Sequence, residues 1–156
     1  MNTLGANYLG SGRAEFIVWA PFHGRVDLHI HGDSHRWVAM NKDAKGYHRV
    51  TVDSVFPGAL YTYQLDGGAD RPDPASRFQP QGVHGPSQLI DAAYPWDDNG
   101  WPGLALADYV IYELHVGTFT AEGTFAAIIP HLDELRDLGV TAIELMPVAQ
   151  FPGSRN

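Results

Sequence analysis

The sequence contains no cysteine, which excludes disulfide bonds and thiolate chemistry. Its first residues, MNTLGANYLGSGRAEF, lack a basic segment followed by an apolar core, so no signal peptide is visible. No apolar run approaches the roughly 20 residues that cross a bilayer. We therefore expect a cytoplasmic protein, although the lack of cysteine alone does not fix the compartment.

Basic residues are scarce: 10 Lys and Arg stand against 18 Asp and Glu, and the formal net charge is −8. Nucleic acids and anionic membrane surfaces are bound through clustered basic side chains, and the sequence has no such cluster. It also has no GxGxxG or P-loop pattern that would hold a phosphate group. We expect no nucleic-acid partner, no membrane partner and no cofactor.

The first half of the chain has the pattern of short strands. Hydrophobic residues make up 44% of the sequence and charged residues 18%, as is typical of a globular protein. In RVDLHIH (25–31) apolar and polar residues alternate, which predicts a strand with one buried face and one face in solvent. Together with turn residues between the segments, this pattern indicates a β-sandwich. The predicted strands are 14–20, 25–31, 36–40, 47–52 and 60–68.

Residues 66–88 differ in character from the segments before them. Their prolines are Pro72, Pro74, Pro80 and Pro86. Proline neither continues a helix nor occupies a central strand. We expect a long packed loop that is pinned against the next domain. Its expected anchors are Phe78, Val83 and Leu89.

After Asp108 the periodicity changes again. YVIYELHV (109–116) and VTAIELM (140–146) are nearly continuous in apolar content, as expected of parallel strands covered on both faces. A helix joins them, so this is the opening β-α-β unit of a parallel sheet or barrel. Two strands cannot close a barrel, and the sequence ends at Asn156 in the loop-like FPGSRN. We therefore expect the front end of a longer enzyme.

The connecting helix is predicted from apolar residues at helical spacing over 125–138. Thr124 is placed to cap its N-terminus, and Gly139 is a suitable residue just after its C-terminus. Pro130 interrupts the pattern. Either the helix begins near Pro130 after an irregular turn, or it kinks there.

Several segments carry a family resemblance: FIVWAPFHGRVDLHI (16–30), RPDPASRFQPQGVHGPSQLID (71–91), VIYELHVGTFTAEGTF (110–125) and LGVTAIELMPVAQFPGSRN (138–156). Together they resemble the alpha-amylase superfamily of glycoside hydrolases (glycoside hydrolase family 13), and within it a trehalose-releasing subfamily. The resemblance implies an immunoglobulin-like β-sandwich, similar to a glycogen-binding module, followed by the truncated start of a (β/α)8 barrel. The expected domains are the sandwich with its loop at 1–92, a linker at 93–107 and the first β-α-β of the barrel at 108–156.

The resemblance also implies a reaction. This subfamily hydrolyses the α-1,4 bond that joins a malto-oligosaccharide to a terminal trehalose, so the implied substrate is malto-oligosyltrehalose. Such retaining chemistry uses a carboxylate nucleophile and a carboxylic general acid about 5 Å apart. In the family these acids follow later barrel strands, and none of their motifs occurs in this sequence. We assign no catalytic residue, leave the substrate-binding residues unassigned and expect this chain alone to be inactive.

Two other interpretations stay open. Branching and debranching enzymes of the superfamily share the domain order, so the whole enzyme could instead be a 1,4-alpha-glucan branching enzyme, which transfers a glycosyl chain. Alternatively, the sandwich is a non-catalytic module that binds α-glucan, or a structural domain that covers the barrel.

Three polar residues of the barrel segment are candidates for a site. Glu113 and His115 lie at the C-terminal end of the first predicted strand, where the active sites of such barrels gather. For an opening strand we expect instead that they hold loop conformations through hydrogen bonds. Glu144 lies within an apolar run, and because a buried carboxylate needs partners we expect it to be structural.

Histidines are dense early in the sandwich, together with two acids. They are His23, His29, His31 and His35, with Asp27 and Asp33. His29 and His31 share one face of the 25–31 strand, so a metal site is conceivable. That face is the polar one, however, and a solvent-facing histidine needs no ligand. We expect no metal.

Aromatic residues of the sandwich could stack on sugar rings or fill its core. Core and cross-strand pairing is the commoner role of alternating aromatics, so we expect that role and name no sugar site. The residues are Trp19, Trp37, Tyr47, Tyr61 and Tyr63.

Overall fold

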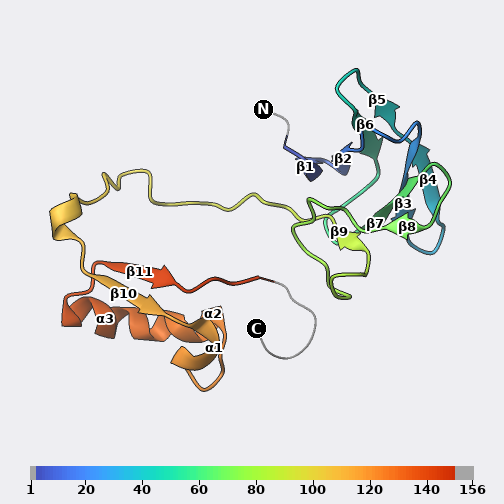
Figure 1. Ribbon diagram of the computed structural model, residues 1–156. Helices are drawn as coiled ribbons and strands as arrows, with labels where there is room; N and C mark the ends of the chain where they lie inside the picture. The colour runs from blue at the N-terminus through green and yellow to red at the C-terminus, as the bar shows by residue number, and fades with distance from the viewer. Residues whose placement is uncertain (1–2, 150–156) are drawn as a thin grey trace. The chain divides into compact units, whose positions relative to one another are not determined.

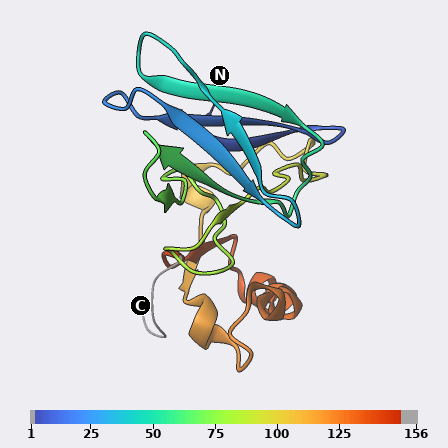
Figure 2. The ribbon, with the colours of Figure 1, turned by 90° about the vertical axis from the view of Figure 1, so that its right-hand side faces the viewer.

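The structure is a computed structural model that describes residues 3–149. These residues form two units, and the boundary between the units in the sequence lies between Tyr94 and Pro95. The first unit is a β-sandwich, seen in Figure 2 as two layers of strands. The second is built around a pair of parallel strands with helical segments (Figure 1). Among the helices of the described residues, none is long and apolar enough to cross a membrane.

One layer of the sandwich is an antiparallel sheet with the strand order β1-β2-β6-β5. Its strands are β1 (Gly5–Gly10), β2 (Arg13–Trp19), β5 (Asn41–Lys42) and β6 (Tyr47–Asp53). The other layer has the order β4-β3-β7-β8, and a short β9 also pairs with β7. Its strands are β3 (Val26–His31), β4 (Arg36–Ala39), β7 (Leu60–Leu65), β8 (Asp70–Arg71) and β9 (Ser87–Gln88).

The core of the sandwich lies between the two sheets, and alternation along each strand determines which side chains enter it. Phe16 of β2 and Tyr61 of β7 meet there edge to face, with ring centroids 5.0 Å apart. Other members of the core include Ala14, Val18, Val26, Leu28, Val52 and Tyr63.

The five strands predicted from alternation are confirmed, with boundaries that differ by a few residues. β1 was not predicted, because GANYLG contains glycine and asparagine, which are poor strand formers. The expectation that the polar face of β3 is in solvent is wrong. Asp27 and His29 are both buried, because neighbouring side chains of the same face cover them.

The proline-rich loop packs on its own sandwich. β8 and β9 pair with β7, and Leu89 is completely buried in the sandwich core. Arg77 donates from Nη1 to the carbonyl of Ala6 at 2.7 Å and so fastens the loop to β1. Leu89, which was expected to anchor the loop against the next domain, is therefore part of the sandwich core. Phe78, another expected anchor, is exposed.

The second unit contains β10 (Ile111–Leu114) and β11 (Ala142–Leu145), which pair in parallel as the sequence predicted. A 3₁₀ turn, η1 (Leu106–Asp108), precedes β10 in the chain. The remaining helical segments lie along one face of the strand pair (Figure 1): α1 (Val116–Phe119), α2 (Phe125–Ile128), η2 (Ile129–His131) and α3 (Leu132–Leu138).

The predicted helix is divided at Pro130, where the 3₁₀ turn η2 separates α2 from α3. Proline lacks the N–H group that would continue the helical hydrogen bonds, and its ring clashes with the preceding turn. The predicted caps are confirmed: the Thr124 side chain accepts from the Ala127 N–H, and Gly139 has a φ of 102°.

The strands of the second unit are largely exposed. Ile111, Tyr112 and Glu113 of β10 are exposed, and only Leu114 of that strand is buried. Leu114 packs with Val116 and Ile128 in a small cluster. The exposed face agrees with the expectation that these strands are the opening unit of a longer sheet, because this segment alone lacks the neighbours that would cover it.

Candidate functional site

Two of the predicted barrel residues are neighbours across the parallel pair. Glu113 of β10 lies directly opposite Glu144 of β11 in the strand register, so the two carboxylates share one face of the pair. Leu114, one residue later, belongs to the opposite face, which packs on the helices. Glu144 is exposed, which corrects the expectation that it is buried. Neither carboxylate matches a catalytic motif of the family, and we assign neither a catalytic role.

His115 begins the loop after β10. Its carbonyl accepts hydrogen bonds from the N–H groups of Thr118 and Phe119, at 3.1 and 3.0 Å, and so starts α1. Its ring lies against Gly117, where an added Cβ would stand 3.1 Å from the His115 Cε1 atom. These contacts define the conformation of the loop at the C-terminal end of the strand.

A cluster of histidines lies on the outer face of the β4-β3-β7-β8 sheet. His29 of β3 is 6% exposed, and its ring stacks on that of Trp37 with centroids 3.9 Å apart. His29 Nδ1 lies 2.6 Å from a carboxylate oxygen of Asp70, and its Nε2 lies 2.7 Å from His35 Nδ1. The ring of His31 is 4.1 Å from that of His29. The structure thus brings three of the four predicted histidines together, and His29 contacts Asp70, which the sequence did not indicate.

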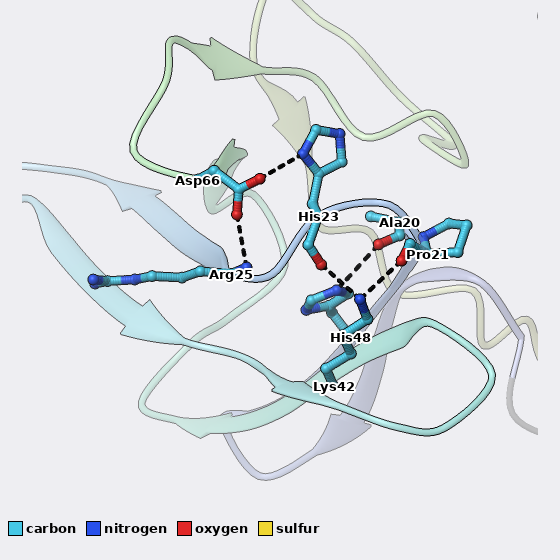
Figure 3. Close-up of polar contacts among 7 residues, drawn as sticks. All are labelled: Ala20, Pro21, His23, Arg25, Lys42, His48 and Asp66. Carbon is cyan, nitrogen blue, oxygen red and sulfur yellow. Dashed lines mark hydrogen bonds and ion pairs between the residues drawn. The ribbon is translucent and has the colours of Figure 1, made fainter.

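His23, the fourth histidine, belongs to a different contact network (Figure 3). Its Nδ1 lies 2.9 Å from Asp66 Oδ2, and the other oxygen of Asp66 accepts from the Arg25 N–H at 2.8 Å. Lys42 Nζ donates to the carbonyls of Pro21 and His23, both at 2.8 Å. These bonds fix the loop between β2 and β3.

The two acids expected near the histidines do not join the cluster as ligands. Asp27 is buried and forms an ion pair with Arg25 Nε at 2.7 Å. Asp33 is exposed in the turn between β3 and β4.

A buried carboxylate, Asp73, fastens the proline-rich loop to the sandwich. Its Oδ2 accepts from the hydroxyls of Tyr61 and Tyr63, at 2.8 and 3.3 Å, and its Oδ1 accepts from the Ala75 N–H at 2.8 Å. Burial raises the pKa of Asp73, although these hydrogen bonds act in the opposite direction. Burial next to Asp73 also raises the pKa of both tyrosines. Sequence reasoning missed Asp73, although an acid between two prolines in RPDPASR is a signal for such a loop anchor.

The aromatic residues divide between the core and the surface. Tyr61 and Tyr63 are core residues, as predicted. Trp19 and Trp37 are 55% and 47% exposed, so neither is a core residue, but both form the expected cross-strand pairs, Trp19 with Tyr47 and Trp37 with His29. Side chains alternate between the two faces of β2. Phe16 and Val18 point into the core, so Trp19, the residue after Val18, points outward.

Trp19 stands on the outer face of the β1-β2-β6-β5 sheet. It pairs with Tyr47 of β6, and its Nε1 donates to the Lys45 carbonyl at 3.1 Å. The Arg49 guanidinium lies 5.6 Å from the centroid of the Tyr47 ring. A groove of about 500 Å³ runs along this face, lined by Leu4, Ile17, Asp43, Ala44, Lys45, Tyr47 and Arg49. The groove lining combines one aromatic side chain, Tyr47, with the charged side chains of Asp43, Lys45 and Arg49, which can form hydrogen bonds.

Two solved structures, of an alpha amylase and a pullulanase, have a similar fold. A crystal structure assigned as an alpha amylase, from Salmonella typhimurium, is 42% identical with a TM-score of 0.85 and covers 99% of this chain and 26% of its own. A pullulanase from Anoxybacillus, solved with maltotetraose, is 25% identical with a TM-score of 0.74 and covers 96% and 26%. This chain thus shares its fold with about a quarter of the length of an alpha amylase and of a pullulanase.

Several curated relatives are named malto-oligosyltrehalose trehalohydrolase. That of Saccharolobus solfataricus is 49% identical over 142 residues, which cover 90% of this chain and 25% of the relative. That of Deinococcus radiodurans is 42% identical over 154 residues, which cover 97% and 25%. The resemblance to a trehalose-releasing subfamily is confirmed.

A branching enzyme also matches. The 1,4-alpha-glucan branching enzyme of Xanthomonas oryzae pv. oryzae is 32% identical over 179 residues, which cover 97% of this chain and 24% of the relative. The chain therefore spans about a quarter of the length of the curated relatives it matches. A scan against protein-family models found no match.

Proposed function

We propose that this chain is the N-terminal part of a malto-oligosyltrehalose trehalohydrolase, a retaining glycoside hydrolase. The whole enzyme cleaves the α-1,4 bond next to the terminal trehalose of malto-oligosyltrehalose and releases trehalose. The observation that carries the proposal is 49% identity over 142 residues to an enzyme of that name. The aligned length is most of this chain, so the likeness is not limited to a short motif.

In this proposal residues 108–156 are the first β-α-β of a (β/α)8 barrel, 93–107 are a linker and 1–92 are the sandwich with its loop. The parallel, in-register pairing of β10 and β11 across a helical connection supports the barrel assignment. The exposed face that carries Glu113 and Glu144 would then turn toward the barrel interior. A cytoplasmic location and the absence of nucleic-acid and membrane partners stay predictions.

The test uses the full-length protein encoded by the gene. Incubation with malto-oligosyltrehalose should release free trehalose, while the 156-residue chain alone should release none. Incubation with a linear α-1,4-glucan should not produce α-1,6 branches. Branch formation without trehalose release would replace the proposal with the branching-enzyme alternative.

A second function, α-glucan binding by the sandwich, is favoured by one observation. Trp19 and Tyr47 are adjacent on the outer face of a sheet, beside the groove that Arg49 and Lys45 line. The apolar faces of sugar rings stack on exposed aromatic side chains, and charged side chains bind the hydroxyl groups at their edges.

Titration of the chain with maltoheptaose tests this binding. Trp19→Ala should weaken it at least tenfold, while Trp101→Ala, a tryptophan that is also exposed but lies in the second unit, should leave it unchanged. No binding at millimolar sugar, or equal loss in both variants, would leave the sandwich with a packing role only.

A further inference from the structure

Three histidine side chains converge at the hairpin between β3 and β4. His29 and His31 are two residues apart on one face of β3, and His35 lies at the end of the turn, just before β4. One ring nitrogen from each of the three lies within 4.8 Å of the others. Imidazole nitrogens at this spacing have the donor type that zinc prefers.

Asp70 fixes the tautomer of His29. An ionised carboxylate only accepts hydrogen bonds, so His29 must carry its proton on Nδ1, which lies 2.6 Å from Asp70 Oδ2. His29 Nε2 therefore carries a lone pair, which accepts the proton of His35 Nδ1, 2.7 Å away.

The same reasoning extends to His31 through Thr62. The Thr62 hydroxyl has one proton, which it donates to Asp70 at 3.0 Å. Its oxygen can then only accept, so His31 carries its proton on Nε2, 3.0 Å from that oxygen. His31 Nδ1 retains a lone pair.

The contacts around His29 match the usual surroundings of a metal ligand. A metal-bound histidine generally donates its second N–H to a carboxylate, which orients the ring and makes it a better donor. Here Asp70 accepts that bond, and the stacked Trp37 ring fixes the plane of His29. In a tetrahedral site with Zn–N distances of about 2.0–2.1 Å, the nitrogen atoms stand about 3.3 Å apart. The His29–His35 separation of 2.7 Å needs only a small widening, in an exposed turn residue.

We propose that His29, His31 and His35 bind a zinc ion, with Asp70 as the residue that orients His29. When the metal binds, the proton on His35 Nδ1 moves through solvent to Nε2 of the same exposed ring, so that His29 Nε2 and His35 Nδ1 both offer lone pairs to the metal. Because His35 is exposed, water completes the coordination. The ion links the turn to β3 and so stabilises the β3–β4 edge of the sandwich. Calcium and magnesium, which prefer oxygen ligands, are excluded by the donor set.

The test is calorimetric titration of the whole, metal-stripped 156-residue chain with zinc chloride. We expect one tight site per chain, and no comparable heat with magnesium or calcium chloride. His35→Gln should weaken zinc binding at least tenfold, because it removes one of three nitrogen ligands. His84→Gln changes another exposed histidine outside the cluster and should leave the affinity unchanged.

Two further measurements separate binding from misfolding. Zinc should raise the Tm of the wild type and of His84→Gln, but not that of His35→Gln; His35→Cys, which keeps a zinc ligand, should recover the rise. Ring ¹⁵N spectra should show zinc-dependent shifts at His29, His31 and His35. Absence of a tight site, equal affinity in His35→Gln and His84→Gln, or shifts confined to other histidines would overturn the proposal and leave a hydrogen-bonded histidine cluster.

Discussion

Glu113 lies directly opposite Glu144 in the parallel pairing of β10 with β11, and both side chains are exposed on the same face. Like charges in direct register repel each other and destabilise a strand pair. In a closed barrel this face would turn inward, where other side chains could offset the repulsion. In the chain as it stands the repulsion acts on the strand pair itself.

Glu113→Gln should therefore stabilise the β10–β11 pair by about 0.5 kcal/mol. The measurement is amide hydrogen exchange at the β10 and β11 positions, which should slow modestly at low ionic strength and less at high salt. Glu122→Gln, which removes an exposed carboxylate from a loop, is the control and should not change the rates. Faster exchange in Glu113→Gln would show that the carboxylate makes a favourable contact.

Asp73→Ala should destabilise the sandwich by about 3 kcal/mol, because it leaves buried donors without an acceptor. Those donors are the hydroxyls of Tyr61 and Tyr63 and the Ala75 N–H. Urea unfolding monitored by fluorescence measures the change. Asp33→Ala, a substitution at an exposed turn position, should cost less than about 0.5 kcal/mol. Similar losses in both variants would mean that Asp73 is not an anchor.

The pKa of Asp73 predicts a pH dependence. Burial raises the pKa of Asp73 in the folded state above its value in the unfolded chain. The stability that this group contributes is then complete below about pH 4 and is lost as the pH rises through the folded-state value. The free energy of unfolding of the wild type minus that of Asp73→Asn should rise as the pH falls from 7 to about 4. A difference that is flat or falls toward low pH would contradict the raised pKa.

Gly46→Ala should destabilise the sandwich more than Gly10→Ala, although both glycines have a positive φ, of 84° and 85°. An added Cβ at Gly46 would stand 2.6 Å from the Cα of Pro21, whereas at Gly10 it meets nothing within 4 Å. We expect about 1 kcal/mol for Gly10→Ala from the backbone conformation alone, and about 3 kcal/mol for Gly46→Ala. Chemical denaturation of the two variants measures this, and equal losses would show that the Pro21 loop yields.

The two units should differ in stability. Ile111, Ile129 and Leu138 are among the apolar side chains that the second unit exposes. Exposed apolar surface of this kind promotes association, and a small core gives little protection. We expect fast amide exchange and dye binding in the second unit, and slow exchange in the sandwich. Uniform protection across both units would contradict this prediction.

The strands of the sandwich could be predicted because their residues alternate, and the caps of the helical connection because Thr124 and Gly139 are typical cap residues. The sequence showed that His29 and His31 share a strand face, but the contact of the histidine cluster with Asp70 could not be predicted. His29 contacts Asp70 across 41 residues of sequence, through the pairing of β3, β7 and β8. Local patterns show which residues share a face of one strand, but not which strand will lie beside it.

The same limit explains the errors about burial. Alternation assigned His29 to the polar face correctly, yet Trp37 from the neighbouring strand covers it there. Trp19 also points to an outer face, because its position in β2 alternates with the inward-pointing Val18. Its cross-strand neighbour Tyr47 covers it less than Trp37 covers His29, and Trp19 stays 55% exposed. Polarity along one strand does not determine exposure once a large side chain lies beside it.

The bond from Arg77 to the carbonyl of Ala6 has a consequence for the order of folding. It joins residues 71 positions apart, and Leu89, later still, completes the core. Contacts between such distant residues form late because the intervening chain must first be ordered. During synthesis from the N-terminus, β1 is therefore made long before Arg77, whose guanidinium group binds it. A ribosome-bound chain that stops short of residue 77 should keep its first strand accessible to chaperones and proteases.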